Sequence, residues 1–309
     1  MQIVLQLVLL ALGFVMLVKG SDWFVDGAAG IAAKFRIPQI IIGLTIVAMG
    51  TSAPEAAVSI TAATAGSADI TVGNVVGSNI MNVLVILGLA SAIIPIAVGK
   101  STLKIDIPFM IAISVIFLLL GWDGTVTRVD GLVLIAFFVA YIGYMIWEAL
   151  HSNEEGDEIK DMPIWKMLLS TAIGLGLVVW GADVAVGAAT KLAEAFGMSQ
   201  RFIGLTVVAL GTSLPELFTS VTAARKGNAD IAIGNIVGSN IFNILFVVGL
   251  SSMVINVPFA ANFRIDMLVA IAACVFVWLA ALKSQKLARW AGFTMLLGYV
   301  GYFIYLLMV

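Results

Sequence analysis

Two glutamates, Glu55 and Glu216, lie in the middle of long apolar stretches of this chain of 309 residues. Each ends a copy of the motif Gly-Thr-Ser-x-Pro-Glu, at residues 50–55 and 211–216. A carboxylate inside a membrane is costly, and such residues usually line the path of an ion or a substrate. The two motifs are therefore the first candidates for a binding site.

Each motif brings further oxygen atoms close to its glutamate. Thr51 and Ser52 precede Glu55 by four and three residues, so the three side chains lie on one face of a helix. Pro54 has no N–H to donate to the carbonyl four residues earlier, which weakens the helix at this point. Backbone carbonyls freed from Ala48 onward are tolerated at membrane depth only where they face a cavity. The second copy offers the same groups at Ala209, Thr212 and Ser213.

A polar stripe follows each motif on the next apolar segment. Asn74, Ser78 and Asn82 recur every four residues, and the second repeat of the stripe has Asn235, Ser239 and Asn243. Two interpretations stay open for Asn74 and Asn235, which could bridge neighbouring helices or belong to the site. The other four lie deeper, and we expect them to be site residues: Ser78, Asn82, Ser239 and Asn243. Small residues spaced four apart should let helices approach closely, at Gly73, Gly77, Gly234 and Gly238.

Together these groups form a set of oxygen ligands. Such a set suits hard cations such as Ca²⁺ and Na⁺, whereas softer transition metals favour histidine or cysteine. The chain has one histidine, His151, and one cysteine, Cys274, which excludes a His-based catalytic triad, an HExxH zinc site and a disulfide framework. Two buried glutamates repel each other, and one divalent cation, two monovalent cations or a proton would relieve the repulsion. We expect no cofactor beyond bound Ca²⁺ and Na⁺.

The composition predicts an all-α polytopic membrane protein. Hydrophobic residues make up 61% of the chain and charged residues 11%, and the apolar residues come in runs of about 20. Nothing indicates nucleic-acid binding or an obligatory protein partner, so the expected surroundings are the lipid bilayer. Helical runs bounded by polar residues, glycine or proline predict ten transmembrane spans. We expect them at 2–33, 38–65, 70–95, 103–121, 129–149, 164–195, 200–225, 231–254, 264–282 and 287–307.

The chain repeats itself at an offset of 161 residues. Without a gap, residues 43–91 and 204–252 share 30 identities in 49 positions. A hydrophilic connector, 151–161, separates five spans from five, which gives a first repeat at 1–150 and a second at 162–309. Because five is odd, the second repeat enters the membrane from the opposite side, and the repeats are inverted, as in many secondary transporters. We expect the broken second and seventh spans to meet at the membrane midplane.

Lysines and arginines in the connections predict the orientation in a plasma or inner cell membrane. The bias puts the acidic linker in the cytoplasm and both termini outside the cell. Four basic residues lie on the outer side, Arg128, Lys191, Arg201 and Arg264. Eleven lie on the inner side, Lys34, Arg36, Lys100, Lys104, Lys160, Lys166, Arg225, Lys226, Lys283, Lys286 and Arg289.

At these motifs the sequence resembles a known family. The paired Gly-Thr-Ser-x-Pro-Glu and Gly-Ser-Asn-Ile segments are similar to the α-repeats of the sodium/calcium exchangers, within the cation/calcium exchanger superfamily. The ten-span layout resembles prokaryotic members, which lack a large regulatory domain. The resemblance implies a transporter and not an enzyme: Na⁺ entering down its gradient drives Ca²⁺ out by alternating access.

The resemblance also implies roles for the candidate residues. Glu55 and Glu216 would hold the central Ca²⁺, with backbone oxygens of Thr51 and Thr212. The first and sixth spans would slide as a pair across the other eight. Each carries an aspartate, Asp22 or Asp183, that could anchor a bend in the helix or lie near an ion entry path, and we favour the structural role. Flanking Na⁺ sites would use Ser52, Ser78 and the Ala48 carbonyl in one repeat, and Ser213, Ser239 and the Ala209 carbonyl in the other.

One position departs from the family pattern. Many members carry an aspartate where this chain has Asn243, and its counterpart Asn82 is also an asparagine. The formal charge of the site is therefore −2, which neutralises one Ca²⁺ or two Na⁺. The family's usual exchange of three Na⁺ for one Ca²⁺ would leave an uncompensated charge.

Three alternatives are less favoured. A proton/calcium antiporter, or another cation/proton antiporter, would load the glutamates alternately with H⁺, but those relatives carry Gly-Asn-x-x-Glu instead. A channel favours symmetric subunits around an axis along the membrane normal. An intramembrane enzyme would need a nucleophile with its base, or a histidine that binds a metal.

Overall fold

The computed structural model describes residues 2–151, 162–198 and 209–308. In this part of the chain eight helices are long and apolar enough to cross a membrane, and a bent pair, Gln39–Thr51 with Ala53–Thr64, makes a ninth. These helices lie within a few residues of nine of the ten predicted spans. The seventh predicted span, 200–225, begins outside the described residues. Most of the linker 151–161 also lies outside them.

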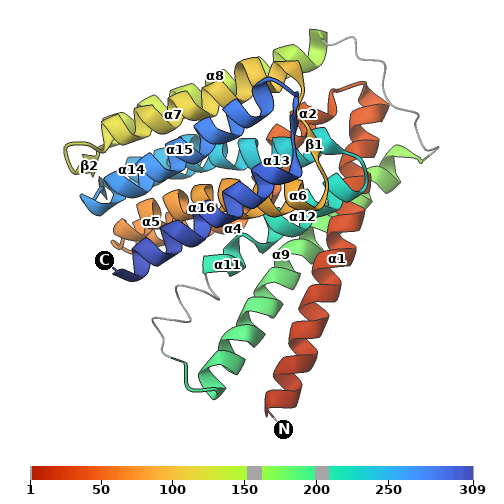
Figure 1. The fold of residues 1–309 in the computed structure, drawn as a ribbon, viewed down its shortest axis with the longest axis horizontal. Coiled ribbons are helices and arrows are strands. Elements are labelled where there is room, and N and C mark those ends of the chain that lie inside the picture. The colour runs from red at the N-terminus through yellow and green to blue at the C-terminus, as the bar shows by residue number, and fades with distance from the viewer. Residues whose placement is uncertain (1, 152–161, 199–208, 309) are drawn as a thin grey trace.

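The elements of the first half follow the predicted order (Figure 1). They are α1 (Gln2–Phe35), α2 (Gln39–Ile42), η1 (Gly43–Val47), α3 (Ala48–Thr51), α4 (Ala53–Thr64), α5 (Asp69–Met81), η2 (Asn82–Leu87), α6 (Gly88–Ile93), β1 (Ile96–Ala97), η3 (Thr102–Asp106), α7 (Ile107–Leu120), β2 (Thr125–Val126) and α8 (Arg128–His151). The elements labelled η are π-helical turns, which occur mostly as single turns inside α-helices, often at functional sites.

The second half repeats most of this series where the structure describes it. It contains α9 (Ile164–Ala195), α11 (Ala209–Thr212), α12 (Leu214–Arg225), α13 (Ala229–Phe242), η5 (Asn243–Val248), α14 (Gly249–Val254), β3 (Val257–Pro258), α15 (Asn262–Leu282), β4 (Lys286–Leu287) and α16 (Arg289–Met308). In both halves the site stripe runs from an α-helix into a π-helical turn that begins at an asparagine, Asn82 or Asn243.

α1 and α9 form a long antiparallel pair that crosses the other helices steeply (Figure 1). Glycines spaced seven apart let the two backbones meet. A Cβ atom on Gly13 would lie 2.7 Å from the Ala185 nitrogen, and one on Gly20 would lie 2.8 Å from the Val178 nitrogen. Such small residues allow close packing between membrane helices, where no hydrophobic force joins them.

The stripe helices α5 and α13 lie in the interior, but they are not equally buried. In α13 and its π-helical turn, 94% of the most apolar stretch is buried, against 72% for the corresponding α5 stretch. The predicted close approach occurs at Gly234, where a Cβ would lie 3.0 Å from the Gly43 Cα. It is not seen at Gly77, which has no described atom within 4 Å of a Cβ. Its counterpart Gly238 meets Leu44, and residue 205, which corresponds to Leu44, lies outside the described residues.

Two short antiparallel ladders join the halves, and the sequence analysis did not predict them. β1 pairs with β4 through Ile96 and Leu287, and β2 pairs with β3 through Val126 and Val257. At the offset of 161, β1 corresponds to β3 and β2 to β4. The two ladders are therefore the same contact made twice, as expected for two repeats related by a two-fold axis.

The second span bends at the first motif. Its two parts meet at Ser52 with an angle of 49° between them, and Pro54 lies in the first turn of the second part. The expectation that the bend frees the Ala48 carbonyl is wrong, because this oxygen accepts a helical hydrogen bond from the Ser52 nitrogen at 3.0 Å. The bend begins at Ser52, so the helical turn that precedes it keeps its hydrogen bonds.

Candidate ion-binding site

The two motif glutamates lie in the first turns of α4 and α12. Each is the third residue of its helix, Glu55 in α4 and Glu216 in α12, and both are 0% exposed. The positive end of a helix dipole stabilises a carboxylate in this position. Neither glutamate has a basic partner, since both ion pairs among the described residues belong to Lys226. Two buried carboxylates without a counter-charge require a cation or a proton.

One motif serine and one stripe serine each hold one carboxylate oxygen. The Ser52 hydroxyl donates to Glu216 Oε1 at 2.8 Å, so a residue of the first repeat contacts the glutamate of the second. Ser78 donates to Glu55 Oε1 at 3.4 Å. The structure thus brings both motifs and the first polar stripe to one place.

Four asparagine side chains connect the two stripes in the interior of the molecule. Asn82 Nδ2 donates to Asn240 Oδ1 at 3.0 Å, and Asn243 Nδ2 donates to Asn79 Oδ1 at 3.1 Å. Asn79 and Asn240 also donate to each other's backbone carbonyls, at 3.2 and 3.3 Å. We call these four residues the amide cluster. At the offset of 161 each hydrogen bond has its counterpart, so the cluster has two-fold symmetry.

Within the described part of the chain, one side-chain oxygen of each glutamate and of two of these asparagines has no hydrogen-bond partner. Buried polar atoms in proteins are almost always paired, so an unpaired set needs a physical reason. All four are acceptors that cannot donate when the glutamates are ionised. A hard cation, which takes carboxylate and amide oxygens as ligands, would satisfy them together. They are Glu55 Oε2, Glu216 Oε2, Asn82 Oδ1 and Asn243 Oδ1.

Asn74 and Asn235 bridge helices, which settles the choice left open by their spacing. Asn74 Nδ2 donates to Ser59 Oγ at 2.9 Å and to the Glu55 carbonyl at 3.1 Å. Asn235 Nδ2 donates to Ser220 Oγ at 2.9 Å. These bonds tie each stripe helix to the helix that carries the glutamate, so they position the carboxylate.

The other candidate residues lie around this centre, but not symmetrically. The Thr51 hydroxyl donates to Asn235 Oδ1 at 2.9 Å, whereas Thr212 is only partly buried and has no such bond. Ser213 is buried with its hydroxyl unpaired. Ser239 lies 3.5 Å from the Ala48 carbonyl. Ala209 begins α11 at the edge of the described residues, and its role stays a prediction.

Asn79 and Asn240 are the residues that the motif analysis missed. They stand inside the Gly-Ser-Asn-Ile segments that were noted for their identity, but only every fourth residue of the stripe was assigned to the site. A signal was present, because a polar residue identical in both copies of an apolar segment needs a buried partner.

With this geometry in view, comparison with known proteins identifies the family. The sequence profile described as sodium/calcium exchanger protein matches the chain twice, over residues 5–147 and 166–308. The chain belongs to the sodium/calcium exchanger family. Exchangers of this family are transporters rather than enzymes, and the apolar helices make this member a multi-pass membrane protein.

Individual relatives cover nearly the whole exchanger chain. CaxA of Alkalimonas amylolytica, a putative antiporter, is 38% identical over 94% of this chain and 95% of its own. The sodium/calcium exchanger MaX1 of Methanosarcina acetivorans is 32% identical over 98% of this chain and 99% of its own. A solved structure of the sodium-calcium exchanger NCX_Mj, soaked with zero Na⁺ and Ca²⁺, has a TM-score of 0.88 at 33% identity and covers 98% of this chain and 99% of that chain.

Proposed function

We propose that this exchanger carries Na⁺ and Ca²⁺ in opposite directions, binding both at one site between Glu55 and Glu216. The observation that carries the proposal is the set of four buried acceptor oxygens without partners, contributed equally by the two repeats. MaX1 is described as a sodium/calcium exchanger, and structures of NCX_Mj were soaked with Na⁺, Ca²⁺ and Sr²⁺. The chemistry of hard cations and oxygen ligands is the same here.

The site charge explains why the two ions compete. Glu55 and Glu216 give −2, which one Ca²⁺ or two Na⁺ neutralise, and either occupant removes the repulsion between the carboxylates. Ser52, Ser78, Ser213 and Ser239 supply hydroxyl oxygens at the margins of the site, where the smaller charge of Na⁺ needs fewer carboxylates. Binding of one kind of ion therefore expels the other, which is the condition for exchange.

Alternating access requires that the site opens to one side at a time. We propose ten spans in two inverted repeats, with both termini outside and the acidic linker in the cytoplasm. The antiparallel pair α1 and α9 would move across the remaining helices, because its close internal packing makes it one rigid body. The two-fold amide cluster would stay fixed at the midplane and keep the ligands in place.

Asn243→Asp tests the charge assignment. A third carboxylate would raise the site charge to −3, so a third Na⁺ would then be compensated. We expect the variant to carry a different net charge per Ca²⁺, measured as the reversal potential of ⁴⁵Ca²⁺ flux in proteoliposomes at set membrane voltages. Unchanged coupling would mean that Asn243 acts only through its hydrogen bond to Asn79.

The function itself is tested by ⁴⁵Ca²⁺ uptake into proteoliposomes. An outward Na⁺ gradient at equal pH should drive uptake, and choline in place of Na⁺ should abolish it. Uptake driven by a pH gradient without Na⁺ would instead establish a proton/calcium antiporter. Single-channel currents across a planar bilayer would establish a pore.

A further inference from the structure

α1 lies along α12 of the second repeat and holds it by three kinds of contact. The rings of Phe14 and Phe218 are 6.0 Å apart. The hydroxyls of Ser21 and Thr222 are hydrogen-bonded at 2.9 Å. Further along the same face, Lys226 reaches α1. These contacts close the bundle on the side of the second repeat.

Lys226 is the centre of a small network. Its ammonium lies 3.0 Å from Asp26 Oδ1 and 3.3 Å from Asp22 Oδ1, and it donates to the Asp22 carbonyl at 2.9 Å. An exposed ion pair alone contributes little, but one ammonium with two carboxylates and a carbonyl fixes its own geometry. The structural role expected for Asp22 is thus an anchor between helices.

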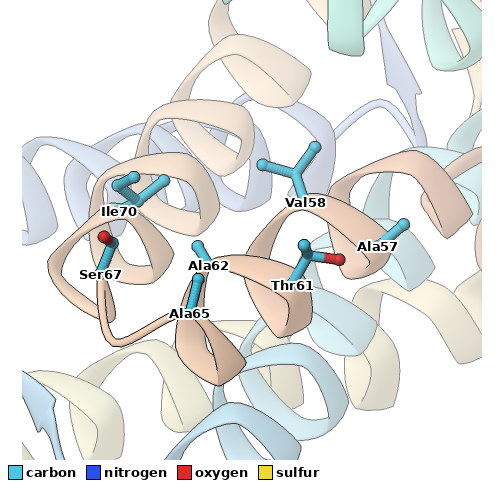
Figure 2. Close-up of a pocket in the computed structure, with 7 residues that line it drawn as sticks. All are labelled: Ala57, Val58, Thr61, Ala62, Ala65, Ser67 and Ile70. Carbon is cyan, nitrogen blue, oxygen red and sulfur yellow. The ribbon is translucent and has the colours of Figure 1, made fainter.

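In the part of the chain that the structure describes, the corresponding face of the first repeat is open. A groove of about 520 Å³ runs along α4 and the start of α5 (Figure 2). Among the described residues, α9 has no packing on α4 comparable to that of α1 on α12. The groove is lined by small and apolar residues, Ala57, Val58, Thr61, Ala62, Ala65, Ser67 and Ile70.

The offset of 161 shows that the α1 contacts have lost their counterparts. Phe218 corresponds to Ala57, and Lys226 corresponds to Ala65. Ser21 of α1 corresponds to Ala182 of α9, and Asp26 corresponds to Gly187. Of the three α1 residues Ser21, Asp22 and Asp26, only Asp22 has the same residue type at the corresponding position, Asp183. The ion network can therefore form on the α12 side and not on the α4 side.

We propose that Lys226, with Asp22 and Asp26, is a positioning group that stabilises the conformation in which α1 rests on α12. The network makes the conformation with a closed α12 face lower in free energy than the conformation with an open α12 face. The inference rests on the alternating access of the proposed function. Lys226 touches no ion, and it acts by setting the fraction of time that each face of the bundle is open.

Thiol labelling measures this fraction without any ion gradient. Ala223 is 0% exposed on α12, whereas its counterpart Ala62 lines the α4 groove. In a background with Cys274→Ala, a cysteine at Ala223 reports opening of the α12 face, and a cysteine at Ala62 serves as the exposed reference. We expect Lys226→Ala to raise Ala223→Cys labelling about three- to tenfold. Lys226→Arg, which keeps the charge, should restore slow labelling.

A second variant builds the missing network in the other repeat. Gly187 has room for a side chain, with no described atom within 4 Å of a Cβ. Ala65→Lys with Gly187→Asp should stabilise the opposite conformation and also raise Ala223→Cys labelling, while leaving Lys226 in place. Choline chloride should raise labelling in the wild type by screening and leave Lys226→Ala unchanged.

Two outcomes separate this inference from the proposed function. Unchanged Ala223→Cys labelling in a folded Lys226→Ala protein that still binds ⁴⁵Ca²⁺ would overturn the positioning role. A labelling shift in a protein whose wild type shows no Na⁺-driven Ca²⁺ uptake would overturn the proposed function and leave the role of Lys226 intact.

Discussion

α4 with α5 and α12 with α13 are two copies of one segment, yet the structure surrounds them differently. α12 is covered by α1, whereas α4 faces an open groove. Asn235 is fully buried and accepts from Thr51, whereas Asn74 is only partly buried. The polar residues of the motif and the stripe are identical in both copies, so they do not cause the difference between Asn74 and Asn235. The difference comes from the position of α1 and α9.

The amide cluster at the centre of the molecule is symmetric, unlike the surroundings of the two copies. The amide cluster makes each of its hydrogen bonds twice, and the two glutamates are equally buried. A symmetric amide cluster inside asymmetric surroundings is what a single site would need if two faces of the bundle open in turn. In the proposed mechanism, the symmetric centre would stay fixed while the asymmetric exterior moves.

The largest expected effect concerns the centre. Glu55→Gln and Glu216→Gln should each lower Na⁺-driven ⁴⁵Ca²⁺ uptake at least about 100-fold, because removing one of two buried charges costs about 3 kcal/mol or more. The two losses should be equal within error, and size-exclusion profiles should stay those of the wild type. One variant that keeps exchange would show that the glutamates are not equivalent.

The next effect concerns the antiparallel pair α1 and α9. A Cβ on Gly174 would lie 2.8 Å from the Gly20 carbonyl oxygen, so Gly174→Ala should force α1 and α9 apart and cost about 1–3 kcal/mol. Gly176, two residues away, has no described atom within 4 Å of a Cβ, so Gly176→Ala is the matched control. Thermal unfolding at a fixed scan rate should show a lower midpoint for Gly174→Ala only. Equal midpoints would mean that the pair can separate freely.

The smallest effect concerns the asymmetry between the copies. Thr51→Val removes a buried hydrogen bond to Asn235 worth about 1 kcal/mol in this conformation. Thr212 lacks that bond here, so Thr212→Val should leave this conformation unaffected. Labelling of Ala223→Cys without Ca²⁺ or Na⁺ should rise about fivefold for Thr51→Val and not for Thr212→Val. Equal changes would mean that the asymmetry does not describe the protein in solution.

Much of the fold follows from hydropathy and repetition. Apolar runs and their punctuation predict the nine helical spans that the structure describes, because backbone groups in a membrane must be satisfied within each helix. The ladders between β1 and β4 and between β2 and β3 were not predicted, since two-residue strands have no periodicity. The separation of seven residues between Gly13 and Gly20 was visible in the sequence, but the sequence did not show which helix these glycines contact.

The site was predicted by residue type more than by contact. Identity between the copies singles out Glu55, Glu216 and the serines near them, because polar residues in apolar runs need a reason. It does not say that Asn82 and Asn243 donate across the repeats, or that Ala48 keeps its helical hydrogen bond. Those contacts depend on how the two repeats pack against each other, and the sequence of one motif copy does not give this packing.

The central claim is that both repeats build one site, and the stoichiometry of Ca²⁺ binding tests it most directly. Equilibrium binding of ⁴⁵Ca²⁺ to the purified protein in Na⁺-free buffer should give one ion per wild-type chain. Glu55→Gln and Glu216→Gln should each abolish that binding at the same free Ca²⁺ concentration. If either variant retains a bound Ca²⁺, or the wild type binds one ion per repeat, each repeat holds its own ion and the shared site is contradicted.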